Sequence, residues 1–128
     1  MYTALLNYSA RGEYFLDAQM SSGATSSTLH TSLANFFPGL RAQIGDIDGA
    51  ERQLHVLHAV WNTFGGFPEL FDTTRGAIHA GGEGYPLRPE LVESFYHACV
   101  AAPYLLPSSR RLKRFVSQVH CHARSHLD

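Results

Sequence analysis

The strongest hydrophobic repeat in the chain lies between residues 48 and 64. Its apolar positions recur at intervals of four, three, four and three: Ala50, Leu54, Leu57, Trp61 and Phe64. This is the spacing of one face of an α-helix. Asp48 and Glu51 resemble a capping box at the start, and Gly65-Gly66 offers the left-handed stop that commonly ends a helix. The pattern predicts a helix over this stretch.

Two further stretches carry a helical pattern. The first begins at Thr28, and its apolar face comprises Leu29, Leu33, Phe36 and Phe37. Pro38-Gly39 should break or kink this helix before apolar positions resume over residues 40–44. The second runs from Pro89, which suits the first position of a helix, to about Ala101. Its side chains expected to pack are Val92, Phe95, Tyr96 and Cys99.

The remaining segments give weaker patterns. Residues 2–10 suggest a short helix, residues 13–20 extended chain, and residues 21–28 a loop rich in Ser, Thr and Gly. Residues 67–85 form a long, glycine-rich connection of a kind that is often functional. Ser108 and Ser109 can cap a last helix, whose apolar face would hold Leu112, Phe115, Val116 and Val119. Because no strand pattern is strong, we predict an all-α fold of antiparallel helices.

Composition agrees with one packed domain. The chain has 128 residues, of which 45% are hydrophobic, with 8 Phe, 6 Tyr and 1 Trp. Its formal net charge of −1 gives no global reason to expect nucleic acid or a membrane surface as partner. Residues 108–128 are basic, with four Arg and one Lys against Asp128 alone. A run of this kind is typical of a solvated helix face.

Targeting signals are sparse. The segment Ala4-Leu-Leu6 is too short for the core of a signal peptide, and no stretch reaches the length of a transmembrane helix. We therefore expect a soluble chain without a targeting segment. Asn7-Tyr8-Ser9 matches the N-glycosylation pattern, which has meaning only in a secreted chain. Cys99 and Cys121 could pair in an oxidising compartment, but two cysteines alone do not indicate in which compartment the chain is found.

The stretch Tyr85–Ser94 concentrates candidate chemistry. Pro86 and Pro89 stiffen the chain, and Glu90 and Glu93 then fall in the first turn of a helix, on neighbouring positions. Arg88 is near enough to orient one of these two glutamates. Acidic residues are also common in first turns simply because they complement the helix dipole, and spacing alone favours that interpretation.

Glu69 adds a third carboxylate. It follows Pro68 directly, as Glu90 follows Pro89, so both glutamates could point into one cleft. Paired carboxylates hydrolyse glycosidic bonds, because one protonates the leaving group while the other activates water. The sequence therefore makes Glu69, Glu90 and Glu93 candidates for acid–base or sugar-binding roles.

Other constellations are weaker. His55 and His58 share a helix face without a third ligand, and His120, Cys121, His122 and His126 form a compact terminal cluster. We interpret both groups as surface or packing residues, and we assign no metal ligand in this chain. No G-x-S-x-G elbow and no phosphate-binding glycine motif occurs.

Four segments of the chain follow a known family pattern: Phe36-Phe-Pro-Gly-Leu40, Gly45-Asp-Ile-Asp48, Phe67-Pro-Glu69 and Tyr85-Pro-Leu-Arg-Pro-Glu-Leu-Val-Glu-Ser94. They resemble glycoside hydrolase family 47, the class I α-1,2-mannosidases. The chain is most similar to the ER degradation-enhancing mannosidase-like branch, which also reads FWPGLQ, then GD, then YPLRPE. The resemblance covers residues 7–99 in order and thins over residues 100–128. Residues 1–128 thus resemble part of one catalytic domain.

The resemblance implies a fold and an activity. The family fold is an (α/α)₇ barrel, of which this chain would be a part. Its enzymes invert configuration as they trim α-1,2-linked mannose from high-mannose N-glycans, and this branch serves ER-associated degradation of misfolded glycoproteins. By this resemblance Glu90 is the catalytic base, Arg88 is the arginine of the motif, and Glu69 and Glu93 line the sugar and calcium-water site. The family also implies a Ca²⁺ cofactor and a location in the endoplasmic reticulum.

The chain departs from the family pattern at three points. The general-acid glutamate has no counterpart here, the Thr-Glu motif that closes the calcium site is missing, and Thr31 stands where many members carry aspartate. The chain therefore resembles an internal portion of a longer domain, and we expect no mannosidase activity from it alone. A non-catalytic glycan- or protein-binding module and a plain helical scaffold are the alternatives.

Overall fold

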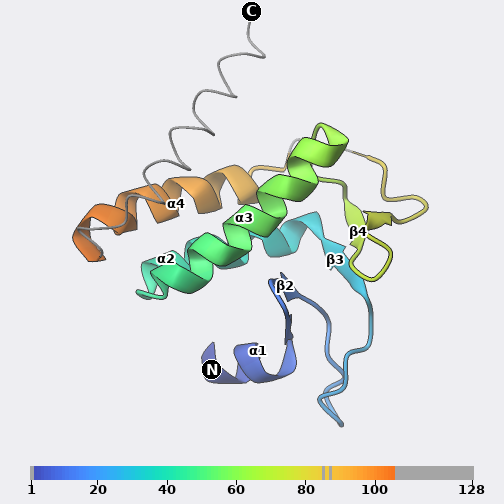
Figure 1. Cartoon of the computed structure of the whole chain (residues 1–128). Helices are drawn as coiled ribbons and strands as arrows, with labels where there is room; N and C mark the ends of the chain where they lie inside the picture. The colour runs from blue at the N-terminus through green and yellow to red at the C-terminus, as the bar shows by residue number, and fades with distance from the viewer. Residues whose placement is uncertain (1, 85, 87, 106–128) are drawn as a thin grey trace, which may run out of the picture.

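Three helices lie together in this protein, with a small sheet at one end of them (Figure 1). The computed structural model describes residues 2–84, 86 and 88–105. The elements run in the order α1 (Tyr2–Tyr8), β1 (Ala10–Arg11), β2 (Tyr14–Phe15), β3 (Leu29–Thr31), the 3₁₀ helix η1 (Ser32–Phe36), α2 (Phe37–Gln43), α3 (Ile47–Phe64), β4 (Leu70–Asp72), β5 (Ala77–Ile78) and α4 (Glu90–Leu105). The helix predicted after Ser108 and the His120–His126 cluster fall outside the described residues.

The core lies where α2, α3, α4 and β4 meet. Its buried apolar side chains are Ala42, Ile47, Ala50, Leu54, Leu57, Val60, Phe67, Phe71, Leu91 and Ala98. Half of them come from α3, whose predicted apolar face is confirmed at its first three positions. Within the described residues no helix has both the length and the apolar character needed to cross a bilayer.

Helix α3 begins two residues earlier than its acidic pattern suggested. Asp46, and not the Asp48–Glu51 pair, is the N-cap, because its Oδ1 accepts a hydrogen bond of 3.0 Å from the Gly49 backbone N–H. The predicted stop is confirmed, since Gly65 closes the helix with φ at 73°. A non-glycine residue would be strained at this φ.

The helix predicted from Thr28 is wrong in its first part. Leu29–Thr31 form strand β3, which pairs antiparallel with β4 so that His30 lies opposite Phe71. A helix forms only after this strand, first as η1 and then as α2. Pro38 lies in the first turn of α2, where the missing N–H costs nothing, so it starts the helix instead of breaking it.

Two hairpins correct the all-α prediction. The connection over residues 67–85 contains β4 and β5, which pair Phe71 with Ile78, and together with β3 they form a three-stranded sheet. Near the N-terminus, β1 pairs with β2 across a turn at Gly12. This pairing confirms the prediction of extended chain after residue 13. The first helix ends at Tyr8, earlier than the predicted end at residue 10. About half of the described chain is helical, and the barrel remains a prediction.

Helix α4 buries a face that matches the predicted one only in part, since Phe95 packs against the core and Cys99 is half-buried, but the other two predicted residues are exposed. Val92 and Tyr96 are 59% and 64% exposed, whereas Leu91, Ser94 and Ala98 are buried. Small residues are favoured at the contact because Gly39 of α2 comes so close that a Cβ there would lie 3.1 Å from the Cα of Ser94. The helix also continues through Pro103 to Leu105, past its expected end at Ala101.

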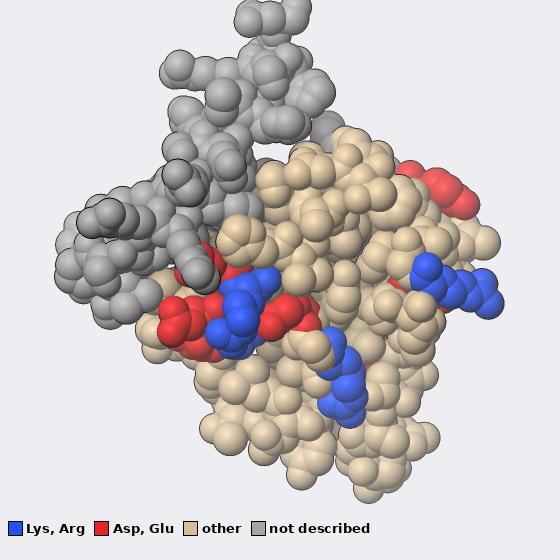
Figure 2. Space-filling model, in the orientation of Figure 1, with Lys and Arg blue, Asp and Glu red and all other residues tan. Residues whose placement is uncertain are grey.

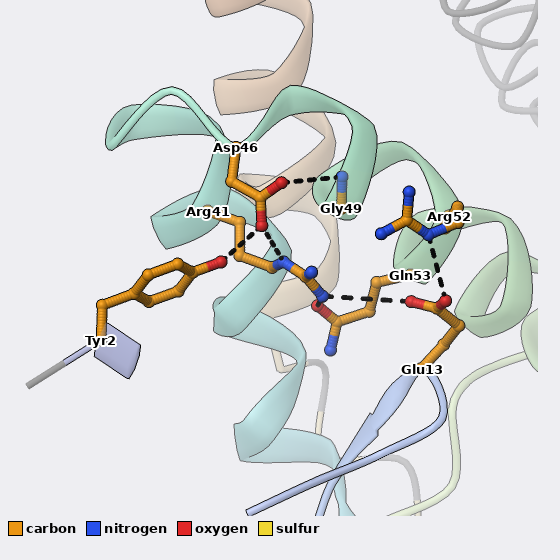
Figure 3. Close-up of polar contacts among 7 residues, drawn as sticks. All are labelled: Tyr2, Glu13, Arg41, Asp46, Gly49, Arg52 and Gln53. Atoms are coloured by element: carbon orange, nitrogen blue, oxygen red, sulfur yellow. Dashed lines mark hydrogen bonds and ion pairs between the residues drawn. The ribbon is translucent and has the colours of Figure 1, made fainter. Parts of the chain in front are cut away.

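A buried arginine ties α2 to the start of α3 (Figure 3). Arg41 donates from Nε to Asp46 Oδ2 at 2.9 Å and from Nη1 to Gln53 Oε1 at 3.4 Å. Its side chain is only 8% exposed. Asp46 also accepts a hydrogen bond from the Tyr2 hydroxyl, so the same carboxylate joins α1 to this group.

The hairpin β1–β2 reaches the same arginine. Glu13 lies 3.9 Å from Arg41 Nη1 and 3.3 Å from Arg52 Nε, and it therefore links a buried cation to an exposed one. In Figure 2, acidic and basic side chains lie next to one another on this face and do not form a patch of a single sign. The charges here stabilise contacts within the chain.

Strand β3 carries a buried histidine. His30 is fully buried, with Nδ1 3.3 Å from the Phe15 carbonyl and Nε2 2.9 Å from Asn35 Oδ1. Burial lowers the pKa of His30, and the two hydrogen bonds offset this only in part. The unfolded chain thus binds a proton at a higher pH than the folded chain does, so stability is complete above the ordinary histidine pKa and declines as the pH falls below it.

We therefore expect the free energy of unfolding to fall between pH 7.5 and 5.5, by at most about 1.4 kcal/mol per pH unit from this one group. Urea titrations at several pH values would measure it. His30→Gln should flatten the dependence, whereas His79→Gln, at an exposed position, should leave it unchanged. An equal slope in His30→Gln and wild type would contradict this assignment.

Candidate functional site at the start of α4

A bidentate ion pair joins the start of β4 to the start of α4. Arg88 donates from Nη2 to Glu69 Oε1 at 2.7 Å and from Nε to Glu69 Oε2 at 2.8 Å. The two side chains are 35% and 28% exposed, respectively. The sequence pattern favoured Glu90 or Glu93 as the partner of Arg88, and this is corrected: the β4–β5 hairpin brings Glu69 to it across 19 positions of sequence.

Glu69 is held from two further sides. Ser32 donates from its hydroxyl to Glu69 Oε2 at 2.8 Å, and its backbone N–H donates to the Glu69 carbonyl at 3.0 Å. On the other side, Glu69 N–H donates to the Gly82 carbonyl at 3.0 Å. A Cβ on Gly82 would lie 2.7 Å from that of Leu70, so a glycine is required for this close approach. The carboxylate is therefore positioned before any ligand arrives.

The ion pair fixes the charge of Glu69. Hydrogen bonds from Arg88, with a further one from Ser32, hold the pKa of Glu69 below its ordinary value. The Glu69 carboxylate in turn raises the pKa of Arg88, and the charge of Glu90 adds to this effect. Glu69 is consequently an anion at neutral pH, suited to accept hydrogen bonds from hydroxyl groups and unsuited to donate a proton.

Glu90 lies next to this pair with one oxygen unused. It is the first residue of α4 and is half-buried. Its Oε2 is buried and has no hydrogen-bond partner among the described residues. A buried carboxylate oxygen without a donor is costly, and a bound water or ligand hydroxyl would satisfy it. The structure thus places a carboxylate that can accept a proton beside a charged, rigid ion pair.

Glu93 is arranged differently from the other two glutamates. Its side chain is 60% exposed, and its Oε1 lies 3.5 Å from His97 Nε2, one turn further along α4. It lines a hollow of about 200 Å³ between α2 and α4, together with Phe36, Gly39, Leu40, Gln43, Ser94 and His97. Of the predicted site residues, Glu69, Arg88 and Glu90 come together, whereas no contact of Glu93 with them is seen in the described part.

Two residues of this site had no signal in the sequence. Ser32 is one of many serines, and only the pairing of β3 with β4 shows that it reaches Glu69. Gly82 belongs to a glycine-rich loop in which the spacing does not distinguish the member that packs against Leu70. Both are found only when segments far apart in the sequence are placed side by side.

The expected calcium ion finds no complete site here. Over the described ranges, no three His, Cys, Asp or Glu side chains lie close enough together to hold a metal ion. Calcium takes six to eight oxygen ligands, and Glu69 already gives both of its oxygens to Arg88. These residues do not fit a calcium site by themselves.

Curated proteins similar to this chain are α-mannosidases or are named as α-mannosidase-like, whereas no family model matches. Human ER degradation-enhancing alpha-mannosidase-like protein 2 is 39% identical over 109 residues, which are 84% of this chain and 19% of that protein. Alpha-mannosidase I MNS4 of Arabidopsis thaliana is 35% identical over 95 residues, 74% of this chain and 15% of its own length. ER degradation-enhancing alpha-mannosidase-like protein 1 of Schizosaccharomyces pombe is 32% identical over 96 residues, which are 75% of this chain and 11% of that protein.

These similarities place the chain in the class of proteins named α-mannosidase or α-mannosidase-like. The chain belongs to glycoside hydrolase family 47, among the α-mannosidase I and ER degradation-enhancing α-mannosidase-like proteins. It spans about a fifth or less of the length of these relatives. The family resemblance of the four sequence segments is confirmed.

Proposed function

We propose that this chain forms the base side of a site that hydrolyses α-1,2-linked mannose in high-mannose N-glycans. The observation that carries the proposal is the unpartnered buried oxygen of Glu90 beside the Glu69–Arg88 ion pair. A carboxylate of this kind can accept the proton of an attacking water. The pair beside it offers fixed acceptors and donors for sugar hydroxyls.

The reaction follows from these roles. Water attacks the anomeric carbon of the mannose, Glu90 takes a proton from that water, and the bond from the anomeric carbon to the glycosidic oxygen breaks. In an inverting enzyme the acid that protonates the leaving oxygen stands about 6.5–9.5 Å from the base. No residue of this chain is assigned to that role. Arg88 and Glu69 bind and orient the sugar, and Glu93, on the exposed side of α4, would contact more distant parts of the glycan.

The place of action comes from the relatives. Several of them carry ER degradation in their names, so we propose that this protein works in the endoplasmic reticulum on misfolded glycoproteins. The substrate would be an N-glycan attached to another protein.

A second candidate function is glycan binding without hydrolysis. A polar hollow of about 490 Å³ lies between residues 25–29 and the β4–β5 hairpin, and Asp72, Arg75 and His79 line it as well. Hydroxyl, carboxylate, guanidinium and imidazole groups together suit a polyhydroxylated ligand. Asp72 ends β4 and lines this hollow, whereas Glu69 directly precedes β4 and pairs with Arg88, so the two carboxylates belong to different sites.

Titration of the chain with a high-mannose glycan, followed by calorimetry, tests both candidates. We expect wild type to bind the glycan. Arg88→Ala should weaken the affinity at least tenfold, and Glu90→Gln should weaken it as well. Arg75→Ala and the exposed control Arg11→Ala should leave the affinity unchanged. Loss of binding in Arg75→Ala alone would assign the ligand to the polar hollow. Wild type without any heat of binding would leave the chain as a scaffold. In parallel, we expect no free mannose to be released by the isolated chain.

A further inference from the structure

We propose that Asn7 carries an N-linked glycan. The inference rests on the proposed location in the endoplasmic reticulum, because the lipid-linked oligosaccharide donor and the transferase are found there. Asn7-Tyr8-Ser9 is the one Asn-x-Ser/Thr sequence in the 128 residues, since Asn35 is followed by Phe36-Phe37 and Asn62 by Thr63-Phe64. The chain therefore offers a single acceptor.

The face of α1 that carries Asn7 is open to solvent. Residues 2, 5, 6 and 9 are half-buried, whereas residues 3, 4, 7 and 8 are exposed, which is the periodicity of a helix lying with one side on the protein. Helix α1 buries no residue completely. Asn7 thus lies on the outer side of a lightly packed helix at the surface, where a bulky sugar has room.

The Asn7 side chain has no structural task that a glycan would interrupt. It makes no side-chain hydrogen bond with the rest of the described chain, unlike Asn35, which holds His30, and Asn62, which contacts His58. Helix α1 is kept in place by other groups, namely the Tyr2 hydroxyl on Asp46 and, just after the helix, the Ser9 carbonyl, which accepts a hydrogen bond of 2.9 Å from the Leu16 N–H. Modification of Asn7 leaves both contacts intact.

The position is compatible with the proposed sugar site. Helix α1 is well separated from β4 in Figure 1, and Asn7 lies among neither the residues that hold Glu69 nor those that line the polar hollow. A glycan there would therefore leave Glu69, Arg88 and Glu90 accessible. Its expected effect is on solubility and on the protection of α1.

The covalent step is a substitution. The Asn7 side-chain nitrogen bonds to the anomeric carbon of the first N-acetylglucosamine, the bond from that carbon to the lipid diphosphate breaks, and the amide loses one proton. The lipid diphosphate is the leaving group, so no oxidant or reductant takes part. Transfer occurs on the extended chain before folding, and the half-burial of Ser9 in the folded chain does not prevent it.

The test is in vitro translation of the full chain with microsomes. The chain receives a heterologous signal peptide and a C-terminal tag with its own Asn-Ala-Thr acceptor, so that the tag reports entry into the lumen. We expect two glycans on wild type, on Ser9→Thr and on the control Asn62→Gln. Only one is expected on Asn7→Gln and on Ser9→Ala, and an N-glycosidase should remove every added glycan.

Wild type that carries only the glycan of the tag would overturn the proposal. The result does not depend on folding, because transfer precedes it, nor on sugar binding or hydrolysis by the chain. Because the signal peptide is supplied, a negative result excludes Asn7 as an acceptor without bearing on the proposed function. Failure of the glycan titration would likewise leave Asn7 as an acceptor.

Discussion

The Arg41→Met variant should lose about 3 kcal/mol of unfolding free energy, because it removes the hydrogen bonds of a buried guanidinium to half-buried Asp46 and to Gln53, and hydrogen bonds to charged groups contribute about 1.5–3 kcal/mol each. Arg41 is 8% exposed and contacts Asp46, Gln53 and, more distantly, Glu13. Methionine fills much of the same space, so the loss reports the charge and its hydrogen bonds. Since domains of this kind are stable by about 5–15 kcal/mol, the variant should unfold at clearly lower urea concentration.

Arg52→Met is the matched control. Arg52 also contacts Glu13, but its side chain is 60% exposed, and exposed pairs contribute about 0–1 kcal/mol. Burial raises the pKa of Asp46, whereas hydrogen bonds from Tyr2, Arg41 and the Gly49 N–H outweigh it and leave that pKa below the ordinary value. In Arg41→Met the pKa of Asp46 should therefore rise, which carboxyl NMR would show. Equal losses of stability in both variants would refute a special role for burial.

The Ser94→Ala variant should lose about 2–4 kcal/mol, because two buried groups would each be left without a partner at about 1–3 kcal/mol apiece. The Ser94 hydroxyl accepts from the Gly39 N–H at 3.0 Å and donates to the Asn35 carbonyl at 2.6 Å. It is 1% exposed, so water cannot replace it. Ser94, the last residue of the stretch Tyr85–Ser94, thus fastens α4 to η1 and α2.

Ser26→Ala, at an exposed position, provides the comparison and should change stability by less than about 0.5 kcal/mol. Chemical denaturation of both variants and wild type measures the difference. If Ser94→Ala unfolds within the error of wild type, the hydroxyl is not the link between the two helices. Glycan titration of a Ser94→Ala sample that remains folded should then also show unchanged affinity.

The long helices could be predicted because each repeats its apolar pattern over several turns. Leu54 and Leu57 are fully buried, as the spacing indicated. Strands of two or three residues carry no such repeat, and β3 and β4 pair across about forty residues of sequence, so neither could be seen. Selecting the large residues Val92 and Tyr96 as the packed face of α4 was wrong, because the close contact with Gly39 favours small ones.

Three residues of the candidate site were predictable, but their pairing was not. Glu69, Arg88 and Glu90 stood out because proline precedes each glutamate and the arginine lies between prolines. Sequence proximity suggested that Arg88 pairs with Glu90 or Glu93, whereas in the fold Arg88 forms its ion pair with Glu69. Ser32 could not be foreseen, since its role depends on a strand pairing that the local sequence does not encode. The roles of these residues in catalysis remain predictions.

The pairing of β3 with β4 has a consequence for how the protein folds. The Ser32 hydroxyl and Glu69 are 37 positions apart, and the chain between them contains α2 and α3. Closing so long a loop costs conformational entropy that local helix formation does not, so the helices should form first and the strand pair later. The carboxylate site is then assembled in the last steps of folding. Substitutions at Ser32 or Gly82 should accordingly accelerate unfolding and leave the folding rate almost unchanged.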